Sequence, residues 1–296
     1  MFLKKKSLAL KGSLIIAASM LIVACGNNET PKDETATTPA VDSASATAPT
    51  DETPEVTYSL PSPLQIASIF KKSGLKYKDG VTSKLMDPSK YTTNLSKAIN
   101  LGVYSADLSY TVLNKQNQEA MNYMKLSRQL ADNLGMGSVF EQGNLSKRFE
   151  KNIGNEDSLA YIIAELQMVT DMYLDENDQQ QVTSIVFSGA WIESMYIGSK
   201  VYEKGKDKSL NNKLAEQMTI LSSIVKALHA VEKKDAAITG LIADLQSVQD
   251  IYAALPSVKN NPTASEDSDK DLTLTDDEVS QLTTKIETIR TKFINE

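Results

Sequence analysis

The stretch NEDSLAYIIAELQMVTDMYLDEN, residues 155–177, decides the fold class of this chain. Its apolar residues recur every three or four positions, which is the period of an α-helix with one buried face. The acids that follow Asn155 would lie in the first turn, where the helix dipole favours negative charge. The segment therefore predicts an amphipathic helix whose buried face consists of Leu159, Ile162, Ile163, Leu166, Val169 and Tyr173.

The same period extends along the chain on both sides of this helix. Glycines at 135, 137 and 154 mark helix ends. No stretch shows the sustained period-two pattern of a strand. We therefore expect a single all-α domain over residues 60–255, an antiparallel helical bundle built from helical hairpins. Its other helices are expected at 63–73, 91–114, 116–134, 180–203, 210–231 and 238–252.

Two windows of the domain resemble each other. GVYSADLSY (102–110) and SGAWIESMY (188–196) each carry a small residue, an aromatic residue, an acid, and a tyrosine three positions after the acid. The similarity fits either a duplicated helical hairpin or chance similarity between two buried helices. Chance is the favoured interpretation, because no fixed period extends beyond the windows.

The N-terminus carries an export signal. Residues 1–24 contain four lysines and end in the apolar run SLIIAASMLIVA, which is too short to span a bilayer. The closing residues Ile22-Val23-Ala24-Cys25 resemble the lipobox of bacterial lipoproteins. That resemblance implies cleavage of residues 1–24 and acylation of the Cys25 thiol, as by palmitate. The expected membrane partner is thus the lipid bilayer, through acylated Cys25.

Cysteine content and charge exclude several classes of site and partner. Cys25 is the only cysteine of the chain, so the domain has no disulfide and no thiolate site. Loss of the signal, with its four lysines and no acid, takes the formal net charge from -7 to -11. An acidic chain of this kind argues against nucleic acid as a partner.

A tether is expected to join the anchor to the domain. Residues 25–59 are rich in Thr, Ser, Ala, Pro and acids, a composition that predicts disorder. About 35 such residues span a mean distance on the order of 30 Å. Gly26 is not the aspartate that retains enteric-type lipoproteins in the inner membrane. The resemblance thus implies a place in the cell envelope, at the outer membrane in a host with two membranes.

Two acids interrupt apolar helical stretches and are the candidate catalytic residues. They are Asp107 and Glu193. Buried carboxylates are costly unless paired, and two that converge could bind a metal or carry out acid–base chemistry. The alternative is that Tyr104, Tyr110 or Tyr196 satisfies each acid locally, or that the helix exposes it.

Other signs of catalysis are absent from the sequence. His229 is the only histidine, so a di-iron site with paired Glu-x-x-His motifs cannot be assembled. A Ser–His–acid triad would need His229, and no motif marks a nucleophile for it. Its short motif His229-x-x-Glu232 loosely resembles that of the imelysin-like lipoproteins, over four residues only. We expect a surface histidine, and an enzyme is the less favoured interpretation.

The C-terminal part begins with an acidic loop, residues 256–274, followed by a helix over 275–296. DSDKDLTLTDDE (267–278) places acids at positions 1, 3, 5 and 12 of an EF-hand, so Asp267, Asp269, Asp271 and Glu278 are candidate calcium ligands. Position 6 is a leucine, where the loop needs glycine. The alternative, which we favour, is that Thr275 and Glu278 form a capping box at the start of the helix. On this interpretation the chain is expected to bind no cofactor.

Three functions stay open from the sequence. The favoured one is a membrane-anchored binding or scaffold module that holds an envelope protein or a small apolar ligand. Its candidate anchors are Trp191, Tyr104 and Tyr196. The alternatives are a calcium-dependent binding protein that uses the 267–278 loop, and an envelope hydrolase that uses the buried carboxylates.

Overall fold

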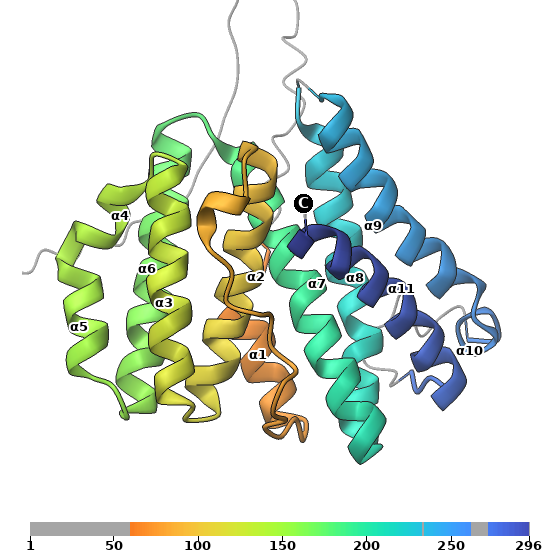
Figure 1. Ribbon diagram of the computed structural model, residues 1–296. Helices are drawn as coiled ribbons and strands as arrows, with labels where there is room; N and C mark the ends of the chain where they lie inside the picture. Colours follow the sequence, from red (N-terminus) through yellow and green to blue (C-terminus); the bar gives the residue numbers. More distant parts are fainter. Residues whose placement is uncertain (1–59, 233, 262–271, 296) are drawn as a thin grey trace, which may run out of the picture. The chain divides into compact units, whose positions relative to one another are not determined.

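The computed structural model describes residues 60–232, 234–261 and 272–295, and the regular secondary structure within these ranges is helical, with no strand. Figure 1 shows the helices packed side by side. The fold class is therefore the all-α class that the sequence predicts. The α-helices are α1 (Pro63–Lys72), α2 (Asn94–Leu113), α3 (Asn117–Asn133), α4 (Gly137–Glu141), α5 (Leu145–Lys151), α6 (Glu156–Glu176), α7 (Gln180–Gly205), α8 (Lys208–Ala230), α9 (Ala236–Ala254), α10 (Pro256–Lys259) and α11 (Asp276–Asn295).

Helix α6 starts where the sequence predicts, because the Asn155 side chain accepts a hydrogen bond from the Ser158 N–H. Helix α2 starts three residues later than predicted. A 3₁₀ turn over residues 88–90 precedes the helix. Thr93 then caps α2: its hydroxyl accepts a hydrogen bond from the Ser96 N–H, and the Ser96 hydroxyl accepts one from the Thr93 N–H. Short-range capping chemistry thus overrides the apolar period at this end.

Helices α2 and α7 form the centre of the fold and run side by side in the same direction (Figure 1). Gly102 and Gly189 bring their backbones together. A Cβ atom on Gly102 would lie 1.9 Å from the Val186 carbonyl oxygen, and one on Gly189 would lie 2.0 Å from that of Ile99. The two contacts are reciprocal, so the two similar sequence windows meet at one interface.

Helix α11 packs on α7, α9 and α2 of its own chain. Val279, Leu282, Ile286, Ile289 and Phe293 are buried in this contact and belong to the same apolar core as the other helices. The described residues belong to one compact unit. The segment after residue 255, predicted as a loop, begins instead with the single turn of α10.

Within the described ranges, we find no helix that combines the length and the apolar character needed to span a bilayer.

Candidate functional site

The α2–α7 interface brings Asp107 and Glu193 together. Both side chains are fully buried, with 0% exposure. Asp107 comes from α2 and Glu193 from α7, and the two carboxyl groups are close enough for the Glu193 charge to act on Asp107. The sequence singled out these two acids, and their convergence follows from the close approach of the helices at the two glycines.

Asp107 is held by the extended segment that precedes α2. Its Oδ2 atom accepts hydrogen bonds from the Ser83 N–H, at 3.2 Å, and from the Ser83 hydroxyl. Burial and the neighbouring Glu193 charge raise the pKa of Asp107 well above its usual range. Asp107 Oδ1 accepts no hydrogen bond from the described residues. The raised pKa favours the uncharged form of Asp107 in this buried place.

Glu193 is neutralised by an arginine of the last helix. Arg290 Nε lies 2.6 Å from Glu193 Oε2, and Arg290 Nη2 lies 2.8 Å from Oε1. The guanidinium also stacks on the Tyr196 ring, 4.0 Å from its centroid. The cluster of Asp107, Glu193 and Arg290 therefore places one guanidinium group against two buried carboxyl groups.

The local alternative for these acids was wrong. No tyrosine of the described ranges bonds to either one: the Tyr110 hydroxyl accepts from the Lys78 N–H at 2.7 Å, and the Tyr104 hydroxyl accepts from the Met86 N–H at 3.2 Å. The partners come instead from distant parts of the chain. Both carboxyl groups are buried, so the arrangement joins α2, α7 and α11 and gives a substrate no surface on either acid.

The aromatic candidates occupy different environments. Trp191 is fully buried, and its indole N–H donates to the Gln217 carbonyl at 3.2 Å. Tyr104 is 1% exposed and lies against the rings of Tyr91 and Tyr123. Only Tyr196 is half-buried, and Arg290 covers its face. The first two are therefore core residues and offer a partner no contact surface.

Glu278 takes part in the predicted capping box. Its Oε2 atom accepts from the Thr275 N–H at 2.7 Å, and the Thr275 hydroxyl accepts from the Glu278 N–H at 3.3 Å. Its other oxygen accepts from the Ser257 N–H at 2.7 Å. Both oxygens are thus engaged by the backbone. Asp267, Asp269 and Asp271, the other proposed calcium ligands, lie outside the described residues, as does Cys25.

His229 is exposed, and its Nε2 atom lies 3.2 Å from the Gln246 side-chain nitrogen. The predicted surface position is confirmed. Across residues 60–232, 234–261 and 272–295, no group of three or more His, Cys, Asp or Glu side chains is placed to hold a metal ion.

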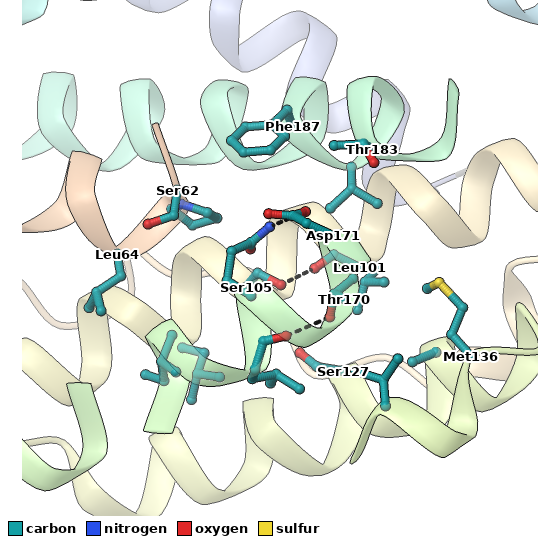
Figure 2. A pocket seen from close by; sticks show the side chains of 18 of the residues that line it. Ser62, Leu64, Leu101, Ser105, Ser127, Met136, Thr170, Asp171, Thr183 and Phe187 are labelled. Carbon is teal, nitrogen blue, oxygen red and sulfur yellow. Dashed lines mark hydrogen bonds between the residues drawn. The ribbon is translucent and has the colours of Figure 1, made fainter. Parts of the chain in front are cut away.

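A pocket opens between α2, α3, α6 and α7, beside the start of α1 (Figure 2). It has room of about 50 Å³ for water-sized groups, within about 720 Å³ of empty space that includes solvent at its mouth. The wall is largely aliphatic, with two phenylalanines. The apolar residues are Pro63, Leu64, Leu101, Leu108, Ala131, Met136, Val139, Phe140, Ile163, Leu166, Leu174, Val186 and Phe187.

A few polar side chains interrupt this wall. Figure 2 shows Asp171 and Thr170 of α6 and Ser105 of α2 around the same space. The Asp171 carboxylate accepts from the Gln167 amide at 2.8 Å. The Ser127 hydroxyl is buried and has no hydrogen-bond partner among the described residues. The pocket thus has the composition of a small-molecule site, with an apolar wall and a few polar groups.

These residues were missed in the sequence, although α6 carries a signal for them. Gln167, Thr170 and Asp171 lie beside the apolar face of the helix, four, seven and eight residues after Ile163. Polar residues that interrupt a buried stripe mark a place where the wall is not filled by aliphatic groups. Arg290 was missed in the same way, because it flanks the apolar seam of α11 next to Ile289.

Comparison of the chain with protein-family models, with curated proteins and with solved structures finds no match.

Proposed function

We propose that this chain is an exported lipoprotein, anchored in the cell envelope through acylated Cys25, whose helical domain binds a small ligand in the α2–α3–α6–α7 pocket. The lipobox-like sequence and the lysine-rich apolar N-terminus support the anchor. The pocket supports the binding function. The observation that carries the proposal is an apolar pocket that contains a buried hydroxyl without a hydrogen bond and an acid without an ionic partner, as far as the described residues go.

The unsatisfied Ser127 hydroxyl favours a ligand over simple packing. A buried polar group without a hydrogen bond costs about 1–3 kcal/mol, and protein interiors rarely keep such groups. A bound molecule that reaches Ser127 would remove this cost. The same molecule would bury its apolar part against the leucines and phenylalanines of the wall.

The pocket also lies close to where the chain arrives from the anchor. Ser62 and Leu64, near the first described residues, form part of its lining. Some 35 residues precede them back to Cys25, which corresponds to a mean reach on the order of 30 Å for a flexible segment. An anchored domain of this design would sample ligands close to the membrane surface.

The buried carboxylates favour a structural role over hydrolysis. Asp107 and Glu193 do converge, as a hydrolase would require, but Arg290 binds both oxygens of Glu193, Ser83 binds one oxygen of Asp107, and neither acid is exposed. The calcium interpretation likewise requires Glu278 to give up two backbone N–H groups. The binding module is therefore the function that the geometry favours.

The test is the content of the pocket after purification from the native envelope. The wild-type lipoprotein, a Thr183→Trp variant and a Thr219→Trp variant are each analysed by native mass spectrometry. Thr183 lines the pocket and is half-buried, whereas Thr219 is exposed on α8 and does not line it. We expect a small molecule on the wild type and on Thr219→Trp, and its loss from Thr183→Trp. An empty wild type, or equal loading of all three, would contradict the proposal.

A further inference from the structure

Asp171 is the only charged residue among the described side chains that line the pocket. It is half-buried on α6, and its neighbours in the wall are aliphatic residues and hydroxyls. Figure 2 shows it near the middle of the pocket. A carboxylate at such a place is stable as an ion only with donors or a cation close by.

Over the part of the chain that the structure describes, Asp171 has no ion-pair partner. Its recorded hydrogen bond is the one from the neutral Gln167 amide. Burial raises the pKa of the Asp171 carboxyl, and the Gln167 bond opposes this rise only in part. By contrast, Glu165 on the same helix forms a bidentate pair with Arg148, with N–O distances of 2.8 and 2.7 Å. On helix α6, Glu165 thus has an arginine partner, whereas Asp171 has no charged partner among the described residues.

We propose that Asp171 is the counter-ion for a ligand that carries a primary ammonium group on an apolar stem. The inference rests on the proposed binding function and names the class of ligand. An ammonium group has three N–H donors and no acceptor. Acceptors are what the pocket supplies: the Asp171 carboxylate, the amide oxygen of Gln167 and the free hydroxyl of Ser127.

Size and charge agree with this class. Room of about 50 Å³ holds a small head group and leaves the stem against the apolar wall and mouth. The formal net charge, -7 for the whole chain and -11 without residues 1–24, attracts a cationic ligand and repels an anionic one. A divalent metal ion is not supported, because the described residues supply no group of three His, Cys, Asp or Glu ligands.

Calorimetric titration with three probes of equal chain length tests the inference: n-hexylammonium, n-hexanol and hexanoate. The protein is residues 26–296, which contain the whole compact unit. An ionic hydrogen bond that hexanol cannot form should make hexylammonium bind about tenfold more tightly than hexanol. Hexanoate should bind more weakly than either. This comparison uses the wild type alone, so it does not depend on the folding of a variant.

A matched pair of variants locates the effect. Asp171→Asn should bind hexylammonium and hexanol equally, because it keeps the shape and removes the charge. Asp175→Asn, one helical turn further along α6, should keep the wild-type preference, since Asp175 is exposed and bonds to Gln180. Short-chain phosphatidylethanolamine and phosphatidylcholine distinguish the source: a preference for the former assigns the ammonium to a lipid head group, and equal binding assigns it to a free amine.

Equal affinity of the wild type for hexylammonium and hexanol would overturn the inference and leave the binding pocket standing. A preference that persists in Asp171→Asn would also overturn it. Absence of binding by every probe would count against the ammonium ligand, and an empty lipoprotein in the envelope preparation would then count separately against the pocket itself.

Discussion

Arg290 of the last helix forms a bidentate ion pair with Glu193 of the central helix α7, and Glu193 is fully buried. The ion pair attaches α11 to α7 by a polar contact, in addition to the apolar contacts between the two helices. It also explains how Asp107 can be buried beside a second carboxylate: Arg290 balances the Glu193 charge, and the neutral Asp107 adds none. The positions of α2, α7 and α11 are thus coupled through three side chains.

Replacement of Arg290 by methionine should lower the free energy of unfolding by about 3–5 kcal/mol, because it leaves a buried charge without its partner. Urea denaturation measures the change. The control is Arg128→Met, whose ion pair with Glu141 is exposed and should contribute less than about 1 kcal/mol. The double variant Glu193→Gln/Arg290→Met should regain part of the loss. Equal losses of unfolding free energy in Arg290→Met and Arg128→Met would show that the buried ion pair contributes no more to stability than the exposed one.

Gly102→Ala should destabilise the fold by more than about 2 kcal/mol, since the new methyl group would overlap the Val186 carbonyl and force α2 away from α7. Gly240→Ala is the matched control. No heavy atom lies within 4 Å of a Cβ placed there, in the interior of α9, so this change should stabilise by about 1 kcal/mol. Thermal denaturation of both variants checks the opposite signs. A stabilised Gly102→Ala would refute the close helix contact.

Asp107→Asn should alter how stability depends on pH. The pKa of Asp107 is raised in the fold by burial and by Glu193, so its neutral form contributes stability that is complete below the unfolded pKa of about 3.9. That contribution is lost as the pH rises through the folded pKa. Asparagine cannot ionise, so the variant should gain stability relative to the wild type as the pH rises. Unfolding curves measured from pH 4 to 9 would run parallel if Asp107 were ionised throughout.

Glu278→Gln should behave in the opposite direction. Burial raises the pKa of Glu278, but the hydrogen bonds from Ser257 and Thr275 outweigh it, and the pKa is lowered overall. The stability that the carboxylate contributes is present above the unfolded pKa and is lost as the pH falls through the folded pKa. The variant should therefore be less stable than the wild type at pH 7 and equal to it in strong acid. Thr275→Ala, which removes the other half of the capping box, should cost about 1 kcal/mol at either pH.

Much of the fold followed from local signals in the sequence. The helical period of the apolar residues predicts α6 and its neighbours, and the capping box of Thr275 and Glu278 predicts the start of α11. Both signals depend only on residues within one or two helical turns. The site did not follow in the same way. The acids at 107 and 193 stand out in apolar stretches, but their partners are Ser83 and Arg290, which lie far away in the chain.

The pocket was still harder to predict. Its lining comes from α1, α2, α3, α4, α6 and α7, and an unfilled space between helices depends on how all of them pack. Asp171 was visible only as a polar interruption beside a buried stripe. Sequence alone cannot tell such an acid from one that an arginine of another helix will neutralise, as Arg148 does for Glu165.

The measurement that tests the central claim most directly is a crystal structure of residues 26–296 grown with n-hexylammonium. The account predicts the ammonium nitrogen about 2.7–2.9 Å from an Asp171 carboxylate oxygen, with the alkyl chain against the apolar wall of the pocket. Density for the amine only on the outer surface, or a pocket left unchanged at a saturating concentration of the amine, would contradict it.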